Sequence, residues 1–122
     1  MAIVAGVDFG TLSVRVSLVD SEHGLIDSSS AEYPLHPKRE DPEYATQSHD
    51  DHMRALTAAT RDTLKKTGMA GDQMQAIALD TAGPSVIPVG KNLRPPGGII
   101  CVRRRSAQRE QLLSFVGYSA SA

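Results

Sequence analysis

The chain has a single cysteine, no tryptophan and only two phenylalanines among its 122 residues. One cysteine excludes an intrachain disulfide, so the sequence does not fit a disulfide-stabilised secreted scaffold. The scarcity of aromatic residues argues against a stacking platform for single-stranded nucleic acid. No apolar run approaches the roughly 20 residues of a membrane-spanning helix, and Asp8 interrupts the apolar N-terminus before a signal-peptide pattern is reached. We therefore expect a cytoplasmic protein with no membrane partner.

Net charge is also nearly absent, with a formal value of −1. That value hides a division, because residues 1–90 contain 7 basic and 13 acidic side chains whereas residues 91–122 contain 6 basic and 1 acidic. The length leaves room for one domain at most. The change of composition near Lys91 predicts a folded acidic region over residues 1–90 and a poorly ordered, irregular basic tail over residues 91–122.

The acidic region carries strand and helix patterns typical of an α/β fold. Residues 3–7 predict a buried strand, and residues 13–20 and 25–33 predict two more strands in an antiparallel meander, with turns at 9–12 and 22–24. Three prolines within residues 34–44 predict an exposed loop. A helical stripe predicts a helix from Thr46 or Ser48 to about Thr67, with Gly68 after it, and residues 74–79 predict a strand before a loop over 80–85. The order β-β-β-α-β implies mixed strand pairing.

Weaker patterns follow. Residues 86–89 predict a short extended segment, residues 99–102 a strand and residues 106–115 a short helix.

The most informative stretch is the first turn, which reads Asp8-x-Gly10-Thr11-x-Ser13-x-Arg15. A carboxylate at the end of a buried strand suits a hydrated Mg²⁺ ion. A glycine lets backbone N–H groups approach an anion, and the two hydroxyls and the guanidinium are phosphate-binding groups. The pattern therefore predicts a phosphate-binding hairpin, and the alternative is an ordinary turn built from the same residue types.

Three segments extend this interpretation: GVDFGTLSVRVSLVD, EYPLHPKREDPEYATQSHDDH and AIALDTAGPSVIPVG. Together they closely resemble the N-terminal part of ribulokinases, which belong to the FGGY carbohydrate kinases, and the resemblance spans roughly residues 2–94. It implies a partial ribonuclease-H-like domain of the actin/hexokinase-like ATPases. It also implies an ATP-dependent kinase of arabinose catabolism that transfers the γ-phosphoryl group to the 5-hydroxyl of ribulose, with ATP and Mg²⁺ as cofactors.

Carried over by position, the resemblance implies that Asp8 helps to hold Mg²⁺. It implies that the ATP phosphates are bound by the hairpin residues Gly10, Thr11, Ser13 and Arg15.

The resemblance also places one segment near the sugar, with Thr81, Gly83 and Ser85 as the substrate-binding residues. Pro84 departs from the family's pattern there, because proline lacks a backbone donor and fixes φ. The resemblance assigns no catalytic residue to this chain, since the downstream carboxylate that serves the family as catalytic base is absent from this sequence.

The run QSHDDH at residues 47–52 has the composition of a metal cluster, and His49 and His52 are three positions apart on the predicted helix. The alternative is a polar helix start at which Asp50 and Asp51 interact favourably with the helix dipole. We predict the helix start.

From Arg94 onward the sequence reads RPPGGIICVRRRSAQREQ, without the aromatic and acidic character that the family implies there. This departure suggests a truncated or frame-shifted kinase that is inactive alone, or one half of a kinase whose C-terminal portion is a separate partner. A different hypothesis is a non-catalytic module that binds nucleic acid or an acidic partner through Arg103–Arg105 and Arg109. We predict instead that this tail is solvated, so nucleic acid is not an expected partner.

Overall fold

A computed structural model describes residues 1–38, 41–81, 89–94 and 99–101 of the chain. The chain divides into two compact units. The first unit comprises Met1–Tyr33 and His52–Ala82, and the second comprises Pro34–Asp51 and Gly83–Ala122.

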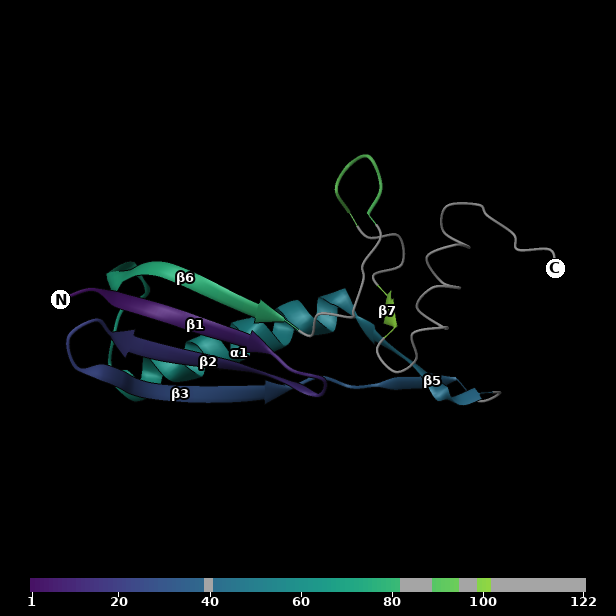
Figure 1. Cartoon of the computed structure of the whole chain (residues 1–122), viewed down its shortest axis with the longest axis horizontal. Helices are drawn as coiled ribbons and strands as arrows, with labels where there is room; N and C mark the ends of the chain where they lie inside the picture. The colour runs from purple at the N-terminus through teal and green to yellow at the C-terminus, as the bar shows by residue number, and fades with distance from the viewer. Residues whose placement is uncertain (39–40, 82–88, 95–98, 102–122) are drawn as a thin grey trace. The chain divides into compact units, whose positions relative to one another are not determined.

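The first unit is built on a four-stranded sheet with the strand order β3-β2-β1-β6 (Figure 1). Strands β1, β2 and β3 form an antiparallel meander, whereas β6 runs parallel to β1. Their bounds are Ile3–Phe9 for β1, Ser13–Asp20 for β2, Gly24–Glu32 for β3 and Met74–Thr81 for β6. The predicted strands, both turns and the β-β-β-α-β order of this unit are therefore confirmed.

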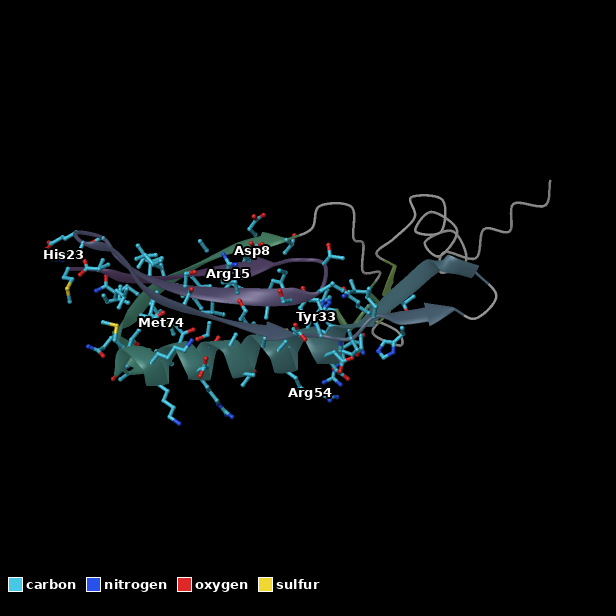
Figure 2. The ribbon with its side chains drawn as sticks, turned by 90° about the horizontal axis from the view of Figure 1, so that it is seen from below. Asp8, Arg15, His23, Tyr33, Arg54 and Met74 are labelled. Carbon is cyan, nitrogen blue, oxygen red and sulfur yellow. The ribbon has the colours of Figure 1, made fainter. Side chains whose placement is uncertain are left out.

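Helix α1 (His49–Thr67) covers one face of this sheet (Figure 2). It ends where predicted, because Gly68 adopts a φ of 69°, a left-handed conformation that glycine adopts without a steric penalty. A short 3₁₀ helix, η1 (Gly71–Gln73), then leads into β6. The core between helix and sheet contains Ile3, Ala5, Val7, Val14, Val16, Leu18, Tyr33, Ala55 and Ala59.

A polar side chain in this core, Thr63, joins the helix to the sheet. Thr63 is fully buried, and its hydroxyl lies 2.8 Å from the Ala59 carbonyl oxygen and 3.2 Å from that of Val16 on β2. A buried hydroxyl with such partners avoids the desolvation penalty of an unpaired group.

Strand β6 carries apolar side chains that α1 does not cover. Ile77 pairs with Ala5 and Leu79 pairs with Val7, so both lie on the helix side of the sheet. Their exposed fractions are nevertheless 61% and 67%. The core of the first unit therefore ends in an exposed apolar strip on β6.

The second unit contains a three-stranded antiparallel sheet with the order β4-β5-β7. Its strands are His36–Lys38 for β4, Asp41–Ser48 for β5 and Ile99–Cys101 for β7. The prediction of a loop over residues 34–44 was therefore wrong for residues 36–38 and 41–44, which lie in β4 and β5. The prolines are accommodated because Pro37 lies in an edge strand and Pro42 lies in the irregular part of the β4–β5 pairing. The strand predicted within residues 99–102 is confirmed for Ile99–Cys101, whereas the helix predicted at 106–115 lies outside the described residues.

The turn between β2 and β3 is held by the carboxylate of Asp20, a buried residue at the end of β2. The carboxylate accepts a hydrogen bond from the backbone N–H of Glu22 at 2.9 Å and lies 3.0 Å from Nδ1 of His23. The Glu22 N–H in the first place, and His23 in addition, hold the pKa of Asp20 below its ordinary value of 3.8. The ionised carboxylate therefore stabilises the fold at pH values above 3.8, and this contribution is lost as the pH falls through the lowered pKa.

We expect Asp20→Asn to lower the thermal unfolding midpoint at about pH 7, because the neutral amide accepts these hydrogen bonds less strongly. The deficit relative to the unmodified chain should be smaller at about pH 3, because below 3.8 the stabilisation by the carboxylate is lost progressively as the pH falls toward the lowered pKa of Asp20. Thermal unfolding followed by circular dichroism at both pH values measures this, with Asp72→Asn on the exposed η1 turn as the control. An equal deficit at both pH values would contradict the assignment.

Candidate phosphate-binding site

The face of the sheet opposite α1 carries a polar row near the carboxyl end of β1. Asp8 pairs with Arg15 on β2 and with Asp80 on β6, and Arg15 in turn pairs with Ser30 on β3. Paired residues on neighbouring strands share a face, and all four of these residues are exposed. Figure 2 shows Asp8 and Arg15 on the side of the sheet away from the helix. Two carboxylates and a guanidinium are thus brought together from three strands.

The next row along this face contains only small side chains. Gly6 pairs with Ser17 on one side and with Ala78 on the other. A Cβ built on Gly6 would meet no atom within 4 Å. A ligand at Asp8 is therefore not obstructed by a long side chain in the row behind it.

The turn from β1 to β2 begins at Gly10. Its backbone N–H donates a hydrogen bond to the Ser13 carbonyl oxygen at 2.8 Å. A Cβ added to Gly10 would lie 3.2 Å from that same oxygen, which is closer than nearly all real Cβ contacts. The close approach of the two arms favours glycine here, because any larger residue would require the Ser13 carbonyl to shift by a few tenths of an ångström. The Gly10 N–H itself is used within the turn, so the N–H groups that face an anion would have to come from other residues of the turn.

Every residue that was predicted to bind ATP phosphates or Mg²⁺ lies in this one hairpin. Asp8 is near the end of β1, Ser13 and Arg15 are in β2, and Gly10 and Thr11 lie between the strands. Among the residues predicted to bind the sugar, Thr81 is the last residue of β6 and pairs with Phe9, which brings it beside the hairpin. Gly83 and Ser85 lie outside the described residues.

Sequence reasoning missed Asp80, which it placed in a loop. That placement was wrong, because the pairing of β6 with β1 continues through Asp80 to Thr81. A signal was present, since the apolar runs before Asp8 and Asp80 both end in an aspartate. The carboxyl ends of adjacent parallel strands meet at one edge of a sheet. Because β6 lies beside β1, the two aspartates are neighbours.

The donor set of this site fits a Mg²⁺ ion with a bound phosphate group. Magnesium prefers oxygen ligands and keeps several waters, which exposed carboxylates such as Asp8 and Asp80 permit. Arginine and hydroxyl groups are phosphate ligands, and Arg15, Thr11 and Ser13 supply them here.

The second stretch considered for metal binding, residues 47–52, has a different role. Within the described part of the chain no group of three or more His, Cys, Asp or Glu side chains is placed to hold a metal. Asp50 and Asp51 lie in the first turn of α1, as the prediction of a polar helix start requires. The His52 ring lies 4.3 Å from the Tyr33 ring between centroids, so it is part of the packing in the first unit.

No described helix is long and apolar enough to cross a membrane.

Residues 3–116 match the N-terminal domain of the FGGY family of carbohydrate kinases. The chain belongs to this family. The matched range of this FGGY-family chain continues beyond Arg94, where the resemblance of the sequence motifs was expected to stop. The family is one of carbohydrate kinases, which are phosphotransferases.

Among curated proteins the FGGY-family chain is similar to two bacterial ribulokinases. It is 29% identical to ribulokinase 2 of Staphylococcus saprophyticus over 103 residues, which cover 78% of this chain and 19% of that protein. It is 28% identical to the ribulokinase of Geobacillus thermodenitrificans over 104 residues, which cover 75% of this chain and 18% of that protein. The chain thus spans about a fifth of the length of the curated relatives it matches.

Solved structures of sugar kinases share the fold of the FGGY-family chain. Xylulose kinase from Lactobacillus acidophilus gives a TM-score of 0.71 at 19% identity, over 97% of this chain and 23% of that one. Glycerol kinase from Plasmodium falciparum gives 0.66 at 16% identity, over the whole of this chain and 24% of that one. The predicted actin/hexokinase-like ATPase fold is therefore confirmed.

Proposed function

We propose that this chain forms the phosphate-binding hairpin of an ATP-dependent, ribulokinase-like sugar kinase. The observation that carries the proposal is the register that aligns Arg15, Asp8 and Asp80 in one exposed row beside the Gly10–Ser13 turn. Phosphoryl transfer depends chiefly on positioning and charge neutralisation, and this row offers groups of both signs at one place.

In this proposal Asp8 and Asp80 hold a hydrated Mg²⁺ ion, which neutralises phosphate charge when it is bound. Two carboxylates alone would repel a polyphosphate, but Arg15 lies next to Asp8 in the same row and offsets that repulsion. The guanidinium carries N–H donors in a planar fork whose geometry matches phosphate oxygens. The hydroxyls of Thr11 and Ser13 supply further donors from the turn.

The sugar is proposed to be ribulose, with its 5-hydroxyl as the acceptor. The similarity to ribulokinases supports this, and the position of Thr81 beside the hairpin is compatible with a sugar close to the phosphates. Thr81, Gly83 and Ser85 would contact the sugar from the end of β6 and the residues after it.

The 122-residue polypeptide is proposed to need the rest of a kinase for turnover. Phosphoryl transfer requires an adenosine site, a base and a metal–phosphate clamp at once. The chain spans about a fifth of the length of its relatives, and the described residues offer candidates for the clamp. Its natural partner would then be a C-terminal kinase portion.

A chimera tests this function. Residues 1–122 replace the corresponding N-terminal segment of the Geobacillus thermodenitrificans ribulokinase, and the unmodified ribulokinase is the positive control. We expect the soluble chimera to phosphorylate ribulose faster than xylulose or glycerol in a Mg²⁺-dependent coupled assay of ADP release, while residues 1–122 alone stay at the blank. A soluble chimera without activity on ribulose, or turnover by the 122 residues alone, would contradict the proposal.

A further inference from the structure

Tyr33 makes three contacts with the backbone of the first turn. Its own N–H donates to the Leu12 carbonyl oxygen at 3.1 Å. Its hydroxyl donates to the Ser13 carbonyl oxygen at 2.9 Å and to that of Gly10, so that one phenolic hydrogen is shared between two carbonyl groups. Tyr33 follows directly after β3, and these contacts join positions 20 and 23 residues apart in sequence.

The Tyr33 side chain is itself firmly held. It is only 4% exposed and belongs to the core cluster with Val7, Val14 and Ala55. Its ring packs against the His52 ring of α1 at a centroid distance of 4.3 Å. The hydroxyl is thus presented to the turn from beneath, on the side of the sheet that the helix covers.

Peptide planarity converts these contacts into an orientation of donors. In a trans peptide the carbonyl of one residue and the N–H of the next point in opposite directions, and the described chain has no cis peptide bond. Because the Gly10 carbonyl points down to Tyr33 in the core, the Thr11 N–H points away from the core. That is the side of the sheet on which Asp8 and Arg15 lie.

From this geometry we infer that Tyr33 is a positioning residue for the phosphate-binding hairpin: its hydroxyl holds the Gly10 carbonyl inward, so that the Thr11 N–H is on the side of the sheet where a phosphate would bind. This inference rests on the proposed function. Burial, and the charge of Asp8 in addition, raise the pKa of the Tyr33 phenol above 10.0. The phenol therefore keeps the proton that it donates.

The experiment compares Tyr33→Phe with Thr63→Val in the full 122-residue chain labelled with ¹⁵N. Thr63→Val is the matched control, because it also removes a buried hydroxyl that bonds to a β2 carbonyl, but that carbonyl belongs to Val16, three residues beyond Ser13 and outside the turn. The probe is inorganic tripolyphosphate with Mg²⁺, and the readouts are its dissociation constant and the exchange rates of the backbone amide hydrogens of residues 10–14.

Tyr33→Phe is expected to weaken tripolyphosphate binding about tenfold and to speed amide exchange in the turn by at least about as much, since a turn hydrogen bond is lost. Thr63→Val should lower the stability of the fold, but it should leave the dissociation constant of tripolyphosphate unchanged and should not speed amide exchange in residues 10–14 more than elsewhere. Unchanged affinity in Tyr33→Phe, or an equal loss in both variants, would overturn the role of Tyr33 alone. If the unmodified chain does not bind the probe at all, the proposed function fails and this inference fails with it.

Discussion

Asp8→Asn in the ribulokinase chimera is expected to lower kcat/KM for ribulose by at least about 100-fold. Asparagine keeps the shape of the side chain but removes the negative charge that is proposed to hold the metal. Asp8 lies between Arg15 and Asp80 in the row, so the substitution also removes the carboxylate from the cross-strand position opposite Arg15. The coupled assay of ADP release at saturating and limiting Mg²⁺ measures the change, and added Mg²⁺ should restore part of it.

Asp27→Asn is the control for this variant. Asp27 is also exposed, but it lies on β3 and its carboxylate accepts a hydrogen bond from the neighbouring N–H of Ser28 at 2.7 Å. We expect it to leave kcat/KM within about twofold, since surface substitutions away from a site have small effects. The assignment of Asp8 would be wrong if both variants retained the activity of the parent chimera.

Leu18→Ala is expected to have the largest effect on stability. Leu18 is 1% exposed on β2 and packs with Ile3 and Ala5 from β1 and with Leu64 and Met74. Truncation of a buried leucine costs about 2–5 kcal/mol. Small domains are stable by only about 5–15 kcal/mol in total, so a large part of the folding free energy would be lost. We expect the thermal midpoint to fall by roughly 10 °C or more.

Leu25→Ala provides the comparison, because Leu25 is 65% exposed at the start of β3. Its removal should change the free energy of unfolding by less than about 0.5 kcal/mol. Urea unfolding of both variants gives the two values. Equal values would show that the first unit is not packed around Leu18.

The sheet of the first unit was predictable because its signals are local. Residues 13–20 alternate between faces in the structure as they do in the sequence, and Val14, Val16 and Leu18 are all buried. The turns at glycine were equally predictable from the sequence, since Gly24 and Gly68 both adopt positive φ. Alternation and glycine turns are properties of short segments, and short segments are what a single sequence reports.

The strands β4 and β5 were not predictable in the same way. Pro37 and Pro42 indicate a break by every local rule, and they are tolerated only because of the edge position of β4 and the irregular pairing of β4 with β5. Those conditions depend on which strands become neighbours, and strand order is not encoded in any one segment.

The same distinction between local and distant residues applies to the candidate site. The hairpin residues from Asp8 to Arg15 are close in sequence and were found together. Asp80 and Tyr33 reach the hairpin from distant positions, through the parallel pairing of β6 and the hydroxyl contacts with the turn. Neither contact leaves a periodic signal, and only Asp80 had a local hint in its position after an apolar run.

The central claim is that the Asp8–Arg15 hairpin binds phosphate together with Mg²⁺. The most direct test is an NMR titration of the ¹⁵N-labelled 122-residue chain with tripolyphosphate in the presence of Mg²⁺. The account predicts amide shift changes concentrated in residues 8–15 and at Asp80, which are absent in Asp8→Asn. Changes confined to the basic run Arg103–Arg105 and insensitive to Asp8→Asn would contradict it, and would favour a module that binds polyanions through its tail.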